Sequence, residues 1–179
     1  MDIMHPDQLA KEAKTAYQRG KYSEASKKFQ IAITAYQTQN KPLLVAEMKN
    51  NLSVALLQDG DAQAALEAVE GTEIEFKEAG DEVKQAMAIG NRAAALEALK
   101  HFDEAEIAYQ QSAALLKSNG ENELLAHVMK SLSALQIRKG KHIDGIINMK
   151  SGLEGIENPS LLQRILQKLL KFPFKFIGR

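Results

Sequence analysis

The sequence contains no cysteine and no tryptophan, and its 23 basic residues are balanced by 23 acidic ones. Without cysteine the chain cannot form a disulfide, use a thiol as a nucleophile or hold zinc through thiolates. Without an excess of positive charge it lacks the field that drives binding to the phosphate backbone of a nucleic acid. We therefore expect no nucleic-acid partner.

Long apolar runs are also missing. No stretch approaches the roughly 18 residues that cross a bilayer, and the opening MDIMHP is too short and too polar for a signal peptide. These two absences predict a cytoplasmic protein. Prolines and aromatic residues are few, whereas alanine, leucine, glutamate, lysine and glutamine are abundant. The latter are strong helix formers, so the composition predicts an all-α fold.

The most informative pattern is a repeat of 40 residues. Two sets of residues recur with this period: Gly20, Gly60, Lys100 and Gly140, and, halfway between them, Asn40, Gly80 and Gly120. Glycine and asparagine tolerate the left-handed conformation that ends many helices, so both sets indicate helix ends. The chain is therefore predicted to alternate helix and turn about every 20 residues. The predicted helices cover 7–19, 22–38, 42–58, 61–78, 81–98, 102–118, 121–138 and 142–155.

Two further sets of residues within each repeat predict how the helices pack. The set Ala25, Ala65, Ala105 and Gly145 is small, and the set Phe29, Val69, Tyr109 and Met149, four residues later, is large. Small residues allow two helix backbones to approach closely, and the large residues one turn on fill the remaining space. The same register continues in Ala32, Thr72, Ser112 and Gly152. A helical repeat is the fold that this pattern favours.

The pattern resembles the tetratricopeptide repeat. Repeat one carries that family's motif as Ala13, Ala16, Gly20, Tyr22, Ala25, Phe29 and Ala32. The 40-residue period is similar to an extended subclass of the family, and the resemblance covers residues 6–158. It implies a right-handed superhelical solenoid of antiparallel helix pairs, with four repeats at about 6–40, 41–80, 81–120 and 121–158. Gly145, Gly152 and Gly155 lie in the expected second helix of repeat four, where each weakens a helix by roughly 1 kcal/mol.

The chain after the repeats has two parts. Residues 159–171 predict an amphipathic helix, which we interpret as a cap on repeat four; a membrane-surface or partner-binding helix is the alternative. Residues 172–179 form a basic aromatic tail. The contacts expected from the tail involve Phe172, Phe174, Lys175 and Phe176, with a lipid surface, a second copy or the chain's own groove. From residue 159 onward there are five basic residues and no acidic ones.

The sequence offers little catalytic chemistry. His5, His101, His127 and His142 share no spacing that brings two of them onto one helical face with a carboxylate. No glycine-rich phosphate loop, serine nucleophile elbow or His-Glu zinc helix occurs. We therefore expect no enzymatic activity, no cofactor and no metal. Gly90, in the expected first helix of repeat three, is interpreted as a close packing contact or an open groove floor.

The resemblance implies that the first helix of each repeat lines a concave groove. The residues expected there are Lys11, Lys14, Asn50, Asn51, Val54, Met87, Asn91, Ala94, His127 and Lys130. Within the family, asparagines in such positions grip a peptide backbone, a role that the resemblance gives to Asn51 and Asn91. The plainer alternative is that both are ordinary polar surface residues. A chaperone-type carboxylate clamp is disfavoured, because Ala10, Met87 and Asn91 occupy positions where that clamp requires basic side chains.

The sequence thus predicts a non-catalytic protein–protein interaction module or scaffold that binds a peptide or partner protein in its groove. The alternative is a self-assembling or membrane-peripheral assembly factor that acts through residues 159–179, with self-association or weak contact between the tail and a membrane surface.

Overall fold

The computed structural model describes residues 5–156 and 158–170. These residues form ten α-helices and no β-strand, which confirms the all-α prediction. The helices are α1 (Pro6–Gln18), α2 (Tyr22–Thr38), α3 (Pro42–Asp59), α4 (Ala62–Val69), α5 (Thr72–Glu78), α6 (Glu82–Ala98), α7 (Phe102–Ser118), α8 (Asn122–Arg138), α9 (His142–Glu154) and α10 (Leu161–Leu170).

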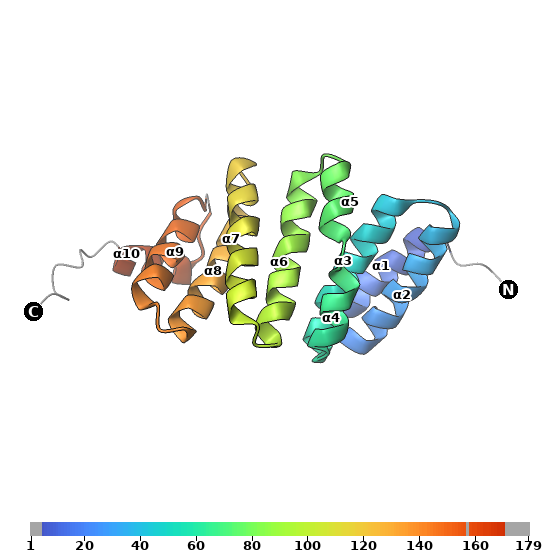
Figure 1. The fold of residues 1–179 in the computed structure, drawn as a ribbon, viewed down its shortest axis with the longest axis horizontal. Helices are drawn as coiled ribbons and strands as arrows, with labels where there is room; N and C mark the ends of the chain where they lie inside the picture. Colours follow the sequence, from blue (N-terminus) through green and yellow to red (C-terminus); the bar gives the residue numbers. More distant parts are fainter. Residues whose placement is uncertain (1–4, 157, 171–179) are drawn as a thin grey trace, which may run out of the picture.

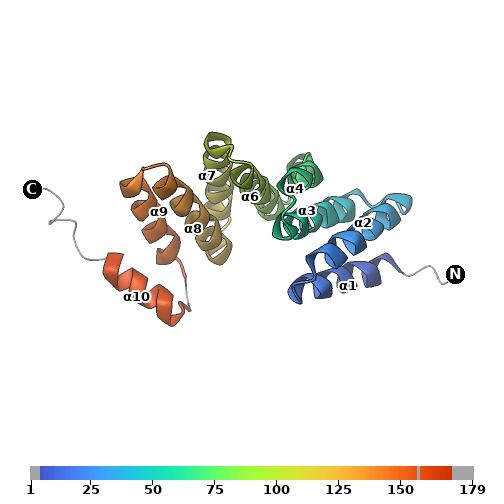
Figure 2. The same cartoon turned by 90° about the horizontal axis from the view of Figure 1, so that it is seen from below.

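The helices follow one another along an arc, in the manner of a helical-repeat protein (Figure 1). The strongest packing is between helices adjacent in sequence, such as α1 with α2, α6 with α7 and α8 with α9. Figure 2 shows the arc from below, with α1, α3, α6 and α8 along its inner side. The outer side carries α2, α4, α7 and α9. The first helix of each predicted pair therefore lines the concave side.

The predicted helix ends are confirmed by the backbone. Every residue of the two periodic sets has a positive φ, from 52° at Asn40 to 94° at Gly60. Lys100 has a φ of 66° although it carries a side chain, in a position where the other repeats have glycine. The left-handed region costs a residue with a Cβ about 1–2 kcal/mol, so the repeat geometry imposes this turn on an unsuitable residue.

The prediction of one helix over 61–78 is wrong, because α4 and α5 are separate. Glu70 (φ −57°, ψ 129°) and Gly71 (φ 78°, ψ −12°) take the dihedral angles of a type II turn. Thr72 supports the turn by donating a hydrogen bond from its hydroxyl to the carbonyl oxygen of Val69, 2.8 Å away. Glycine is required at the second central position of such a turn. The remaining predicted helices agree with the structure to within a few residues.

The glycines of α9 serve close packing. An added Cβ at Gly145 would lie 2.9 Å from the carbonyl oxygen of Ser133, and one at Gly152 would lie 2.7 Å from the Cβ of Met129. The hydroxyl of Ser133 also donates to the carbonyl oxygen of Gly145 over 2.6 Å. The backbones of α8 and α9 are therefore in direct contact, and α9 forms a continuous helix despite its low intrinsic propensity.

The core is divided into three clusters. One lies among α1, α2 and α3 around Phe29, and a second lies among α6, α7 and α8 around Leu132. Between them is a small third cluster, which consists of Ala46, Val69, Phe76 and Ala88. The third cluster joins α3 to α6 through the interrupted pair α4 and α5. The small residues Ala25, Ala65 and Ala105 are fully buried, as their spacing predicted.

Helix α10 packs on α9 along one edge. Gln167 donates a hydrogen bond to the carbonyl oxygen of Leu153 over 2.7 Å, and Leu166 and Leu170 are partly buried. The other four apolar side chains that were expected to be covered by a cap are exposed. They are Leu161, Leu162, Ile165 and Leu169. The helix thus covers α9 with its margin and not with its apolar face.

Candidate functional site: the inner helical surface

The structure distributes the ten predicted groove residues over α1, α3, α6 and α8, the four inner helices. Five are exposed: Lys11, Lys14, Met87, His127 and Lys130. Four are partly buried: Asn51, Val54, Asn91 and Ala94. Asn50 is only 6% exposed and belongs to the interior. The surface thus presents basic side chains near both ends and small or apolar side chains between them.

Two of the asparagines pair with each other. The side-chain nitrogen of Asn91 donates to the side-chain oxygen of Asn50 over 2.7 Å, which links α6 to α3. The amide nitrogen of Asn91 is therefore already engaged within the protein. A ligand could use the amide oxygen and the second N–H of Asn91 without breaking this pair.

Asn51 has the opposite situation. Its side-chain nitrogen is buried and has no hydrogen-bond partner among the described residues. In the 40-residue register Asn51 corresponds to Asn91, and Ala10 corresponds to Asn50, so the acceptor found in the next repeat is replaced by a methyl group. A buried donor without an acceptor costs about 1–3 kcal/mol. Among the described residues, Asn51 is the one side-chain amide on the inner helices whose buried nitrogen lacks a hydrogen-bond partner.

A hollow of about 490 Å³ lies between α1 and α3. Lys11 and Lys14 line it, together with Glu47 of α3. Glu47 forms ion pairs with Lys14 at 3.2 Å and with Lys84 of α6 at 3.5 Å, so it connects three inner helices. The ion pairs of Glu47 with Lys14 and Lys84 were not predicted. These three charged side chains come together only when α1, α3 and α6 pack side by side.

The floor of the same hollow holds a buried tyrosine. The hydroxyl of Tyr36 donates a hydrogen bond to Asp7. Burial, together with this bond to a carboxylate, raises the pKa of Tyr36 to about 12. The hydrogen bond from Tyr36 in turn lowers the pKa of Asp7. The pair fixes the start of α1 against α2 and keeps a negative charge at this end of the surface.

A second hollow, of about 400 Å³, lies at the other end, between α8, α9 and α10. His127 and Lys130 of α8 line it, and Met149, Leu162 and Leu166 supply apolar walls. An acidic residue, Glu123, lies at the margin. Four of the ten predicted groove residues therefore border hollows at the two ends of the inner surface, and the other six line neither hollow.

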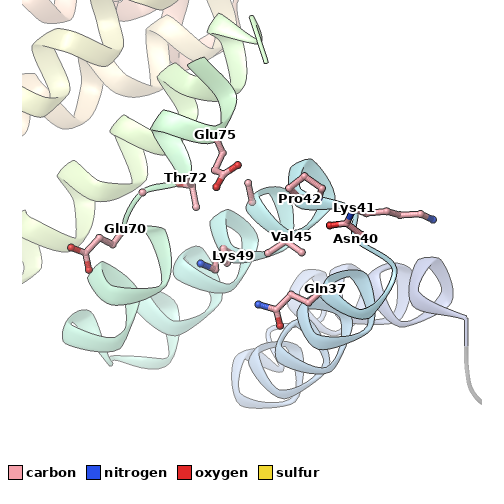
Figure 3. A pocket seen from close by; sticks show the side chains of 11 residues that line it. Gln37, Asn40, Lys41, Pro42, Val45, Lys49, Glu70, Thr72 and Glu75 are labelled. Carbon is pink, nitrogen blue, oxygen red and sulfur yellow. The ribbon is translucent and has the colours of Figure 1, made fainter. Parts of the chain in front are cut away.

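A further cavity of about 410 Å³ lies between α2, α3 and α5, next to the type II turn (Figure 3). Gln37 of α2, Val45 and Lys49 of α3, and Thr72 and Glu75 of α5 project from its walls. It exists because α4 and α5 are separated, which sequence reasoning missed. The side chains in it are of mixed polarity and include no nucleophile–base pair.

Ionic contacts between the third and fourth pairs of helices were also not predicted. Glu106 of α7 is buried and accepts hydrogen bonds from Lys139, Lys141 and Gln136. Burial alone raises the pKa of Glu106, but the bonds from the two lysines and the glutamine outweigh it and lower the pKa to about 2. The glutamate therefore stays ionised and ties α7 to the end of α8.

The described residues contain no cluster of three or more side chains suited to hold a metal ion. No helix in the described part of the chain has the length and apolarity for crossing a membrane. The predicted tail contacts Phe172, Phe174, Lys175 and Phe176 lie outside the described residues.

Comparison of the sequence with protein-family models and with curated proteins gives no match. The fold is similar to a solved structure, described as the crystal structure of BtubC (BKLC) from P. vanneervenii. The TM-score is 0.73, the alignment covers 89% of this chain and 70% of that one, and the sequences are 16% identical. At this identity the likeness concerns the fold alone, and it supports the helical-repeat arrangement.

Proposed function

We propose that the chain is a non-catalytic protein-interaction module, a right-handed solenoid of four tetratricopeptide-type repeats that binds a peptide or partner protein on its inner surface. The pairs α1–α2, α3 with α4 and α5, α6–α7 and α8–α9 follow the 40-residue register and would form the four repeats. The observation that carries the proposal is the pair of hollows at opposite ends of this surface, each lined by predicted groove residues.

The side chains of the inner surface indicate the chemistry of the partner. Lys14 is neutralised by Glu47, but Lys11 at one end and Lys130 at the other are exposed cations that favour acidic groups on the ligand. Met87, between the two ends, offers an exposed and flexible apolar contact. A segment with acidic residues flanking an apolar centre therefore fits best, in extended or helical form.

Site-specific photo-crosslinking tests the proposal. A photoreactive amino acid would replace Met87 or His127 on the inner surface, and Ile31 or Ile107 on the outer helices α2 and α7 as matched controls. Both isoleucines are more than half exposed, and Met87 and His127 are exposed as well, so all four sites are accessible. After irradiation in an extract of the source cells, we expect discrete crosslinked species from the inner positions and none of them from the outer positions.

A charge-reversal variant then distinguishes a ligand bound on the inner surface from random contact. Lys11→Glu combined with Lys130→Glu should abolish the crosslinks at residue 87, because both ends of the surface would repel an acidic ligand. Equal crosslinking from inner and outer positions, or inner crosslinks that persist in this variant, would show that the partner binds elsewhere.

A further inference from the structure

The exposed apolar face of α10 has no covering element among the described residues. Leu161, Leu162, Ile165 and Leu169 are 76%, 66%, 47% and 59% exposed. At about 100° per residue these four side chains fall within an arc of roughly 100° on the helix. The face is therefore continuous, and Leu162, which also lines the hollow between α8, α9 and α10, forms its border with the edge that contacts α9.

Basic side chains border this face on the side away from α9. Arg164 and Lys168 are exposed and lie next to Leu161 and Ile165 on the helical wheel. Between residues 159 and 179 there are five basic residues and no acidic one. An exposed apolar arc beside an unbroken basic margin is the arrangement of a helix that lies in the plane of an anionic lipid surface.

The geometry of the whole molecule leaves this face accessible. Figures 1 and 2 show α10 at one end of the arc, with α9 beside it and no other helix beyond it. Leu161, Ile165 and Leu169 at this end of the molecule are exposed to solvent.

A second copy of the chain fits the face less well. All charged residues of α10 are positive, so two such helices placed face to face would bring like charges together. The helix has 10 residues and is about 15 Å long. Its exposed arc is therefore far smaller than the roughly 800 Å² per partner of a stable interface.

We propose that α10 docks the protein on anionic membrane surfaces, with its leucine and isoleucine face in the lipid and Arg164 and Lys168 at the phosphates. Leu162 also lines the hollow between α8, α9 and α10, but Leu161, Ile165, Leu169 and the two basic residues do not line it, so most of this face is distinct from the inner helical surface. Binding at one therefore does not require binding at the other, and each proposal can fail alone.

Vesicle flotation with the full chain tests the proposal. We expect binding to vesicles of phosphatidylcholine containing about one third phosphatidylserine, and little binding to phosphatidylcholine alone. Leu161→Gln with Leu169→Gln should weaken binding at least tenfold. Arg164→Gln with Lys168→Gln should also weaken it, about thirtyfold at about 1 kcal/mol per charge, and reduce its dependence on salt.

Ile31→Gln with Ile107→Gln is the matched control, since it removes two exposed isoleucines from other helices and should leave vesicle binding unchanged. The charge variant keeps all apolar side chains of α10. It therefore still tests the proposal if the leucine variant unfolds this helix. Failure of the intact protein to bind anionic vesicles, or equal binding by all variants, would overturn the proposal. Sedimentation velocity showing a dimer that the leucine variant dissociates, without vesicle binding, would assign the face to a second copy instead.

Discussion

Replacing Gly152 in α9 by alanine is expected to destabilise the protein, although alanine is the better helix former. The helix backbone at Gly152 lies directly on α8. A Cβ added there would come within 2.7 Å of the Cβ of Met129 and 3.4 Å of the Cα of Ala126. Neither atom belongs to the flexible end of a side chain. The new methyl group therefore fits only if α9 moves away from α8.

Two opposing effects determine the size of the change. Alanine gains about 1 kcal/mol over glycine in a helix interior. Overpacking a well-packed contact costs about 1–3 kcal/mol, and a gap of 2.7 Å between two backbone-proximal carbons places this site toward the upper part of that range. We therefore expect a net loss of about 1–2 kcal/mol. For a chain of this length that corresponds to a fall in Tm of about 2–8 °C.

Urea denaturation followed by circular dichroism at 222 nm measures the change, with Gly155→Ala as the control. A Cβ at Gly155 would lie 2.7 Å from the side-chain oxygen of Asn122 and 3.2 Å from its Cβ. Asn122 is exposed, so rotation of its side chain relieves the first contact, and a shift of a few tenths of an ångström relieves the second. The control should therefore be close to neutral. A Gly152→Ala protein as stable as wild type, or more stable, would refute the close-packing argument and restore the view that this glycine merely weakens α9.

Three further predictions concern other parts of the chain. Asn91→Ala should cost about 1–3 kcal/mol by leaving the buried oxygen of Asn50 unpaired, whereas Asn51→Ala should cost nothing, as urea titration of both would show. Gly71→Ala should lower the free energy of unfolding by about 1–2 kcal/mol in the same assay. Its φ is 78° and no atom lies within 4 Å of the added Cβ, so the loss would come from the backbone conformation alone. The stabilising effect of Glu106 is present above its ordinary pKa of 4.5 and is lost as the pH falls toward about 2; thermal melts of Glu106→Gln should accordingly vary less with pH across that interval than those of wild type.

Most of the fold could be predicted from the sequence because residue type and spacing mark the helix ends and the close helix contacts of each repeat. Glycine or asparagine at a helix end and alanine at a close contact, as at Gly60 and Ala65, act through backbone geometry and size. Both can be recognised from the residue type and its spacing. The break at Glu70 and Gly71 was missed because the period predicts a continuous helix there. Gly71 followed by Thr72 indicates a turn. Predicting the break would have meant relying on this local pattern rather than on the 40-residue period.

The candidate site was predicted in part. The resemblance to the tetratricopeptide repeat implied that Lys11, Lys14, His127 and Lys130 lie on the inner side, and all four line hollows there. Hydrogen bonds between repeats could not be predicted, because they depend on how far each repeat is rotated against the next. That rotation pairs Asn91 with its neighbour Asn50 and not with a ligand. The exposure of the α10 face likewise depends on the angle at which this helix meets α9.

The division of the core has a consequence for how the protein unfolds. The clusters around Phe29 and Leu132 share no buried residue, and the segment 62–78 connects them through the third cluster, with Leu66 packed on one and Ala68 on the other. Each half thus contains most of its own stabilising contacts. Cooperative unfolding of the whole chain therefore depends on the small third cluster and the segment 62–78. Substitutions in α4 or α5 should therefore separate a single melting transition into two, with half of the arc ordered between them, whereas substitutions of similar cost within either half should only shift the midpoint.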